Sequence, residues 1–570
     1  MKFKFLLTLA FAAGASLSLM AQGYKDGVEY YKADRLTQAE ELLNRNLDNA
    51  DTDKALSYYY LGQIQLGRYY TAKRTNHGNP ASFLKEAGDY FQKGLAADPE
   101  NPFNYVGAGN IELINGNSKA AEELFKDAEK LDKKDAGIYA AVARAYYDVN
   151  PTLYAKQMSK AIATGEKLVQ KQALSNNPKW ADNDHDFYMF MGDMAFDAAN
   201  GDSKKVGDAC NFYESAIRVN PKAAEGYIKY ADKLLTVKRV NEAVTQLNAL
   251  LKNSPNSALG QRELAEVLYN DGQIKKGMDE YAKLMKNPNH FKSDEDRYLS
   301  LLYFVNDYQT GFDEASAMLT ANPGNFSARR FQYIFANLLQ RPDALDMAEQ
   351  LLKFKSDTNR FAYGDFALIA GDLAKAGRKD EAVQVIEMGL NEYPKEASVV
   401  KGAARFYCYD ANDYGKAADY MQKYIDLAGD NATGSDLFNL STYAYFGAQT
   451  APADDTAAKE KYLTMSENAI KKADSLLGAD YKYQTPKRMG DIALMRNDNA
   501  AAEQEYLKAI SMAEQNVTDN NKSDLASLYR ALGVAYVKDK KTAEARDCFQ
   551  KYLNLNPDDT DVANILKQLK

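Results

Sequence analysis

The sequence contains few cysteines, the residue type that builds disulfide frameworks and many metal sites. Three occur among its 570 residues, at Cys210, Cys408 and Cys548. They are far apart and odd in number, so their spacing fits neither a disulfide framework nor a zinc site. We expect three buried thiols.

Histidine is equally scarce, with His77, His185 and His290 spread over separate parts of the chain. No glycine-rich phosphate loop follows a predicted strand, and no strands are predicted. The sequence therefore predicts no catalytic site, no cofactor and no metal. One alternative stays open, a hydrolase whose carboxylates converge within the irregular segment 293–360.

No long basic run is present. The chain carries 71 basic and 79 acidic residues, which gives a net charge of −8. Nucleic-acid binding depends on neutralising phosphates with Lys and Arg, so nucleic acid is not expected as the main ligand.

Long apolar runs are absent after the first 22 residues. Lys2 and Lys4 precede an apolar stretch that ends near Met20, and small residues lead to a predicted cleavage after Ala21. This pattern indicates a secretory signal peptide at 1–22. A membrane anchor is the alternative, but the run is short and interrupted by Gly and Ser. We expect an exported, most simply periplasmic, protein whose mature chain has no membrane span.

Helix-forming residues dominate the rest, and one spacing recurs. In the stretch 526–557, Leu532-Gly533 and Tyr536 are followed by Ala545, Phe549 and Pro557. Gly533 and Ala545 allow two helices to approach closely, and the aromatic rings fill the space beside that contact. Pro557 ends the second helix, because it lacks an N–H and disfavours helical geometry in the preceding residue.

These residues resemble the tetratricopeptide repeat (TPR), a pair of antiparallel helices with a period of about 34 residues. The resemblance covers nearly all of the mature chain and implies an all-α, right-handed superhelical solenoid of roughly fourteen helix pairs. We expect apolar side chains to be covered mainly by the adjacent hairpin.

The strength of the repeat pattern divides the mature chain into three parts. It predicts an N-terminal array at 23–292, degenerate TPR-like helices at 293–360 and a C-terminal array at 361–570. Two irregularities are also predicted: an insertion at 68–80 within a turn, and a polar loop at 176–186.

Asp182, Asp184 and Asp186 alternate within that polar loop as the ligands of a calcium loop do. Such a loop needs Gly at its sixth position and a bidentate acid at its twelfth. Phe187 takes the place of the Gly, and Asp193 is a short substitute for the acid. The pattern therefore does not predict a calcium site.

TPR superhelices resemble one another in binding partners on the concave surface lined by the first helix of each pair. Carried over by position, this resemblance implies a mixed set of aromatic, amide and charged groove residues, which suits protein or peptide recognition. The candidates are Tyr59, Gln63, Val106, Asn110, Arg144, Tyr147, Met189, Asp193, Ile228, Asp232, Lys487 and Asp491.

The clamp that some TPR domains use for a carboxyl-terminal peptide is not matched. Lys487 and Arg488 lie near its positions, but Asp491 stands where Asn is expected. We therefore expect an exported scaffold or adaptor for partner proteins or peptides in cell-envelope assembly or secretion. A glycan- or peptidoglycan-binding protein is the alternative, and the oligomeric state stays open.

Two short motifs resemble the O-glycosylation acceptor of certain anaerobic Gram-negative bacteria. Asp455-Thr456-Ala457 and Asp474-Ser475-Leu476 would make Thr456 and Ser475 the acceptors.

Overall fold

The computed structural model describes residues 23–175, 177–202, 205–478, 481–515 and 522–569. Across these ranges the regular structure is helical and no strand occurs, which confirms the all-α prediction. The predicted signal peptide at 1–22 lies outside them. No helix in the described ranges has the length and apolar character needed to cross a membrane. The chain divides into two compact units, 1–321 and 322–570.

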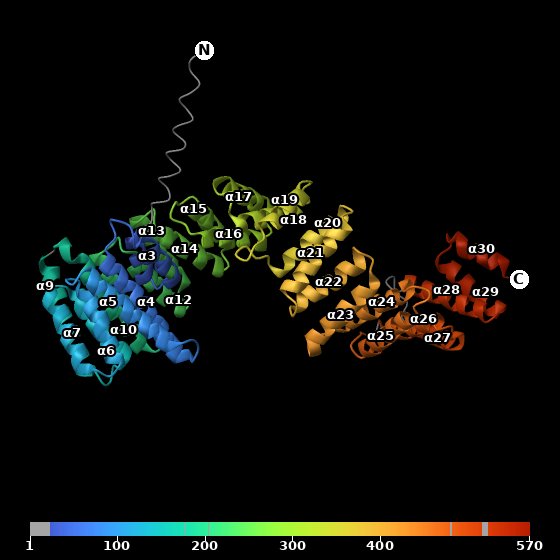
Figure 1. Ribbon diagram of the computed structural model, residues 1–570, viewed down its shortest axis with the longest axis horizontal. Coiled ribbons are helices and arrows are strands. Elements are labelled where there is room, and N and C mark those ends of the chain that lie inside the picture. Colours follow the sequence, from blue (N-terminus) through green and yellow to red (C-terminus); the bar gives the residue numbers. More distant parts are fainter. Residues whose placement is uncertain (1–22, 176, 203–204, 479–480, 516–521, 570) are drawn as a thin grey trace, which may run out of the picture. The chain divides into compact units, whose positions relative to one another are not determined.

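In the first unit, successive helices pair as antiparallel hairpins, α2 with α3, α4 with α5 and so on to α16 with α17 (Figure 1). Their bounds are α2 Tyr24–Lys32, α3 Leu36–Asn46, α4 Lys54–Thr75, α5 Pro80–Ala97, α6 Pro102–Ile114, α7 Ser118–Leu131, α8 Ala136–Val149, α9 Ala155–Ser175, α10 Ala181–Ala199, α11 Val206–Val219, α12 Ala224–Thr236, α13 Val240–Asn253, α14 Ala258–Asn270, α15 Ile274–Met285, α16 Lys292–Phe304 and α17 Tyr308–Ala321.

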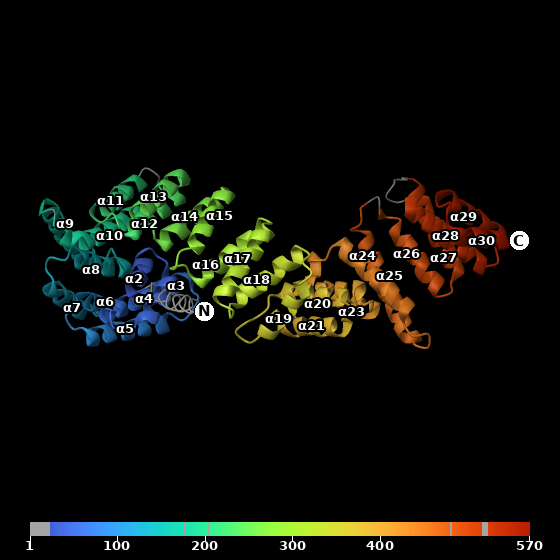
Figure 2. The same ribbon diagram turned by 90° about the horizontal axis from the view of Figure 1, so that it is seen from above.

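The second unit continues in the same way, from α18 with α19 to α28 with α29, and ends with α30 (Figure 2). Its helices are α18 Phe326–Leu338, α19 Ala344–Phe354, α20 Tyr363–Lys375, α21 Lys379–Glu392, α22 Ala397–Tyr409, α23 Tyr414–Ala428, α24 Gly434–Thr450, α25 Thr456–Asp474, α26 Gln484–Met495, α27 Asn499–Glu514, α28 Lys522–Lys538, α29 Thr542–Leu555 and α30 Thr560–Gln568. The handedness of the superhelix and the number of pairs stay predictions.

A close contact between a glycine and an aromatic ring recurs inside the hairpins. A Cβ at Gly109 on α6 would lie 2.4 Å from Cε1 of Phe125 on α7, and one at Gly62 would lie 2.5 Å from Cε1 of Phe91. Only glycine leaves room for these buried rings. The same contact joins Gly192 to Tyr213, Gly490 to Tyr506 and Gly533 to Phe549.

The first unit also contains contacts between helices that are far apart in sequence. Helix α2, which Figure 2 labels, packs against α12. The Tyr30 ring meets the Phe291 ring edge-on, with centroids 5.3 Å apart. Arg262 Nη1 donates a 2.9 Å hydrogen bond to the Tyr30 hydroxyl. The sequence predicts cover mainly from the adjacent hairpin, and these contacts add cover between helices that are far apart in sequence.

Two predicted loops are wrong. Residues 68–75 of the predicted insertion continue α4, which runs to Thr75, so only a short turn separates it from α5. Within 176–186, α10 already begins at Ala181, after a short 3-10 helix at Pro178–Trp180. Polar composition suggested a loop, but polar side chains at the start of a helix are also compatible with capping and the helix dipole.

The predicted degenerate segment consists of ordinary helices. Helices α16 and α17 form one hairpin, and α18 and α19 form another. The boundary between the two units falls between these hairpins, at Ala321 and Asn322.

The expectation for the cysteines is confirmed. Cys210, Cys408 and Cys548 are free and buried.

The contact between Gly109 and Phe125 predicts opposite effects of one substitution at two sites. Gly109→Ala should lower the free energy of unfolding by about 1–2 kcal/mol, because overpacking outweighs the better helix propensity of Ala. Gly88→Ala on α5 is the matched control, since a Cβ there meets nothing within 4 Å. It should raise stability by about 0.5–1 kcal/mol. Thermal and urea unfolding followed by circular dichroism measure both, and a stabilised Gly109→Ala variant would contradict the packing argument.

Candidate functional site

A cavity of about 400 Å³ opens in the first unit, where α2 meets the first helices of several hairpins. Its walls come from α2, α4, α6, α8, α10 and α12. The lining residues are Tyr31, Lys32, Asp34, Tyr59, Tyr60, Gln63, Phe103, Gly137, Ala140, Ala141, Arg144, Asp148, Asp186, Met189, Phe190, Asp193, Asp197, Glu225, Lys229 and Lys233.

Helical periodicity explains why these residues share a wall. The α8 residues that line the cavity follow a spacing of three, four, seven and eleven positions from Gly137, which is one face of a helix. The lining residues of α10 follow the same spacing from Asp186. The pairs Gly137 and Asp186, Ala140 and Met189, Ala141 and Phe190, Arg144 and Asp193, and Asp148 and Asp197 therefore occupy equivalent positions in neighbouring repeats.

Asp193 is the centre of the charge network in this cavity. Arg144 Nη2 lies 2.7 Å and Lys229 Nζ 3.2 Å from its Oδ2, while the Tyr213 hydroxyl donates to Oδ1 at 2.9 Å. Burial raises the pKa of Asp193, but Lys229 and Arg144 outweigh it and bring the pKa down to about 2. Asp193 is therefore ionised at any physiological pH.

For Asp148, the effects that raise the pKa outweigh those that lower it. Burial within the concave wall raises its pKa to about 6, although Arg144 opposes the shift, and the carboxylates of Asp197 and Asp193 add to it. Asp148 is nonetheless an exposed residue, so solvent screens its charge and limits the effect of this shift on stability. Within the described chain neither Asp148 nor Asp197 forms a salt bridge, and Asp197 accepts a hydrogen bond from Tyr147 at 3.1 Å. These two acids leave uncompensated negative charge at the cavity.

The N-terminal hairpin closes one side of the cavity through ion pairs. Lys32 pairs with Asp186 at 2.5 Å, and Asp34 lies 3.5 Å from Lys229. Arg35, next to Asp34, pairs with Glu263 at 2.6 Å and with Asp232 at 3.3 Å. Sequence reasoning missed the contribution of the α2–α3 hairpin, because these partners are 154 to 228 positions away.

The structure gathers some of the predicted groove residues and separates others. Tyr59, Gln63, Arg144, Met189 and Asp193 line the cavity.

The remaining candidates of the first unit have other roles. Tyr147 binds Asp197, and Asn110 is 3% exposed and accepts a hydrogen bond from Tyr70. Val106 and Ile228 are buried between helices, with 1% and 0% exposed, so they offer no binding surface. Asp232 is engaged by Arg35.

The two candidates of the second unit lie together on α26. Lys487 pairs with Asp524 at 2.8 Å, and Asp491 accepts a 2.9 Å hydrogen bond from Tyr506. This bond repeats the Tyr213–Asp193 bond of the first unit, and in both places the acid follows the glycine of the close contact. Asp491 therefore also helps to hold its own hairpin.

The remaining predicted sites are polar positions with defined places. Asp182, Asp184 and Asp186 lie on the first turns of α10 and not in a loop. Thr456 is exposed at the start of α25, and Ser475 is exposed just after its end. Glycosylation at these two residues stays a prediction.

The pKa of Asp148 predicts a pH-dependent effect of Asp148→Asn. A pKa raised from 3.8 to about 6 on folding means that the contribution of Asp148 to stability is fully present below pH 3.8 and is lost as the pH rises through 6. At pH 7 to 8 the variant should therefore be more stable than the wild type, by less than about 1 kcal/mol because solvent screens the group. Below pH 4 the two should unfold alike.

Unfolding temperatures between pH 4 and pH 8 measure this effect. Asp127→Asn, which removes an exposed partner of Lys130 on α7, is the control and should change little at any pH. A variant of Asp148 that is less stable at pH 7, or equally shifted at every pH, would contradict the interpretation.

Comparison with known proteins supports the nature of the repeat. Residues 526–559 match the family model of the tetratricopeptide repeat. No curated protein matches the chain by sequence.

Solved structures similar to this chain include two tetratricopeptide repeat proteins and one yeast protein. The C-terminal part of a TPR repeat-containing protein from Cytophaga hutchinsonii is 16% identical, with 47% of this chain and 98% of that chain covered and a TM-score of 0.36. A tetratricopeptide repeat protein from Parabacteroides merdae is 14% identical, with 47% and 98% covered and a TM-score of 0.31. Yeast Tom70 is 13% identical, with 84% and 96% covered and a TM-score of 0.28.

The matched segment coincides with α28 and α29, the hairpin that contains Gly533 and Phe549. The same contact between a glycine and a ring holds hairpins in both units. Residues 526–559 therefore form a tetratricopeptide repeat.

Proposed function

We propose that the protein is an exported, periplasmic scaffold or adaptor that binds partner proteins or peptides on the concave faces of its repeats. The single observation that carries the proposal is the cavity of the first unit, which is lined by equivalent positions of neighbouring repeats, charged side chains among them. The export pattern at 1–22 supports a role in the cell envelope, in assembly or secretion.

The rigidity of the cavity wall favours binding of a flexible partner. Ion pairs join Asp193 of α10 to Arg144 of α8 and to Lys229 of α12. The Tyr213 hydroxyl donates a hydrogen bond to Asp193. A site that is already ordered loses little conformational entropy on binding, so the entropic cost falls mainly on the partner.

The charges of the cavity indicate which side chain a partner would present. Six acids and four basic residues line it, and Asp148 and Asp197 are the acids without a salt bridge in the described structure. A Lys or Arg of an extended segment would compensate them. We therefore propose a partner segment with at least one basic residue.

The aromatic residues of the cavity fit a polypeptide better than a sugar. Tyr59 and Tyr60 are each 8% exposed, and their rings pack at 5.1 Å from one another. Tyr60 also packs against Tyr31 at 4.9 Å, and Tyr59 against Phe103 at 5.3 Å. Little free ring face is left for a glycan to stack on.

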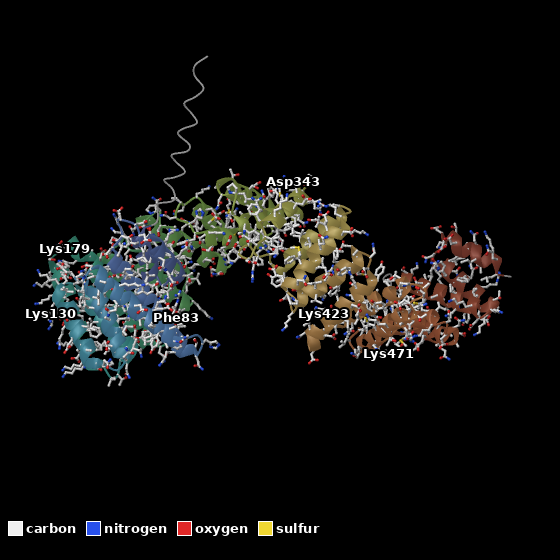
Figure 3. The ribbon with its side chains drawn as sticks, in the orientation of Figure 1. Phe83, Lys130, Lys179, Asp343, Lys423 and Lys471 are labelled. Carbon is white, nitrogen blue, oxygen red and sulfur yellow. The ribbon has the colours of Figure 1, made fainter. Side chains whose placement is uncertain are left out.

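Site-specific photocrosslinking in intact cells tests this proposal. A photoreactive amino acid at Gln63, which lines the cavity, should capture one or a few defined partner proteins. The same amino acid at Lys130 is the control, because Lys130 is exposed on α7 outside the cavity (Figure 3).

Partners captured at Gln63 and absent at Lys130 would support binding in the cavity. Asp148→Asn should weaken that capture, because it removes the negative charge that the basic side chain is proposed to meet. Identical products from both positions, or none at Gln63, would contradict the proposal. Cell fractionation with periplasmic and cytoplasmic markers tests the location separately.

A further inference from the structure

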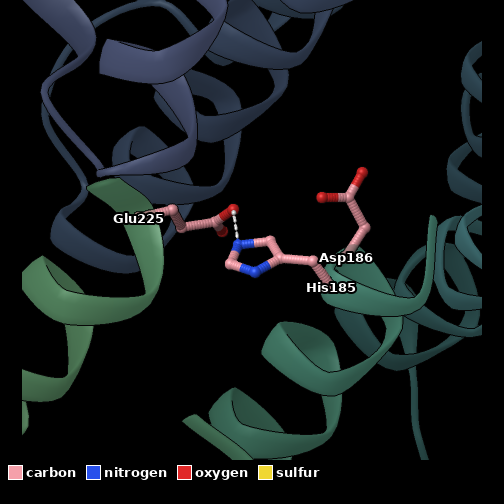
Figure 4. Close-up of side chains that lie close together, drawn as sticks. All are labelled: His185, Asp186 and Glu225. Carbon is pink, nitrogen blue, oxygen red and sulfur yellow. Dashed lines mark ion pairs between the residues drawn. The ribbon is translucent and has the colours of Figure 1, made fainter. Parts of the chain in front are cut away.

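A second cluster of side chains lies at the edge of the cavity, and it contains a histidine, which the cavity lining lacks. His185 and Asp186 are neighbours on α10, and Glu225 reaches toward His185 from α12 (Figure 4). One ligand atom from each of the three lies within 4.8 Å of the other two. Among the described residues, these three are the His, Cys, Asp or Glu side chains whose possible ligand atoms lie close enough together to hold one metal ion.

The hydrogen bonding of His185 determines what its second nitrogen offers. Nδ1 lies 3.0 Å from the backbone carbonyl of Ala216, so this nitrogen donates and carries a proton. In the neutral ring Nε2 is then a bare acceptor. A histidine that donates one N–H to a backbone carbonyl and offers the other nitrogen is the usual arrangement of a metal ligand.

The group that Nε2 faces is another acceptor. Glu225 Oε2 lies 3.3 Å away, and neither atom has a hydrogen-bond partner although both are buried. His185 is 2% exposed and Glu225 7%. Two buried lone pairs that face one another need a positive charge between them.

The distance between the two acceptors leaves room for a metal ion between them. Charge-assisted N–H···O bonds are usually about 2.7–2.9 Å long. Zinc bonds to nitrogen and oxygen of about 2.0–2.2 Å place two tetrahedral ligands about 3.4 Å apart. The observed 3.3 Å is close to the second value.

We propose that His185 Nε2, Glu225 Oε2 and an Asp186 carboxylate oxygen bind a divalent transition-metal ion of the zinc class. Water fills the fourth position, because Asp186 and Glu225 both line the cavity and leave an entry path to it. The nitrogen ligand selects such an ion over calcium or magnesium, which prefer oxygen ligands.

Lys32 is the internal competitor of this ion. Its ammonium group pairs with Asp186 Oδ1 at 2.5 Å, and Lys229 lies 3.7 Å from Glu225 Oε1. A metal ion bound to Asp186 repels the ammonium of Lys32, so the two cations exclude each other. Metal binding therefore weakens one contact that holds α2 against α10.

Calorimetric titration of the full chain without a polyhistidine tag, at pH 7.5 with Zn²⁺, tests the site. The wild type should bind one ion there, and Glu225→Gln, which keeps the shape of the side chain, should bind it at least about tenfold more weakly. Lys32→Met should bind it more tightly than the wild type. Ca²⁺ and Mg²⁺ should give no comparable binding.

His290 provides a matched control. Its Nδ1 lies 2.6 Å from the carbonyl of Asn287 and its Nε2 3.1 Å from Glu295, so it repeats the pairing of His185 without the third ligand. His290→Gln should leave Zn²⁺ binding unchanged, whereas His185→Gln should abolish it. Circular dichroism in EDTA shows whether each variant is folded, and Glu225→Gln and Lys32→Met carry the test if His185→Gln does not fold.

Co²⁺ gives a readout that does not depend on affinity. A four-coordinate ion at this site should produce visible d–d absorption in the wild type, and Glu225→Gln should lose it. A wild type that binds no Zn²⁺, or a Glu225→Gln variant that binds it as the wild type does, would overturn the proposal. The cluster would then be an imidazolium–carboxylate pair.

Discussion

The close contact between a glycine and a buried aromatic ring is the constraint on which the structure depends. It sets how near the two helices of a hairpin approach, as between Gly109 and Phe125. It also connects the core to the concave surface. Where the ring belongs to Tyr213 or Tyr506, its hydroxyl binds the acid that follows the glycine, Asp193 or Asp491. Packing inside a hairpin thereby orients a charged group outside it.

Closure of the first unit changes what its concave surface can do. In an open array the first helices would line a continuous groove, as in the general description of solenoids. Here Lys32, Asp34 and Arg35 bridge to α10, α12 and α14, and the groove beside them becomes a cavity. Several charged side chains of the cavity wall therefore already have an ion-pair partner in the N-terminal hairpin. The groups that remain, Asp148 and Asp197, determine the character of the site.

The cavity and the histidine cluster share residues and are therefore linked. Asp186 pairs with Lys32 of the closing hairpin and belongs to the proposed metal site. Glu225 and Lys229 lie on one face of α12 and contact both regions. A charge added or removed at one region changes the electrostatic balance of the other, because the cavity walls screen poorly.

Part of the candidate site could be predicted because helical spacing repeats. Tyr59, Arg144, Met189 and Asp193 were found by position within successive repeats, and all four line the cavity. Val106 and Ile228 were chosen by the same rule and are buried. Spacing identifies a face of a helix, but the width of that face open to solvent depends on how closely the next repeat packs.

The sequence alone determined the repeating unit, because glycine, alanine and aromatic residues at fixed spacings suffice to define a helical hairpin. It also determined that the chain is all-α and that its cysteines are buried. Only the tertiary structure decided that α2 meets α12 and that His185 faces Glu225. Such contacts depend on the small rotation of each repeat relative to the next, added over several repeats. A local pattern of residues does not determine this total rotation.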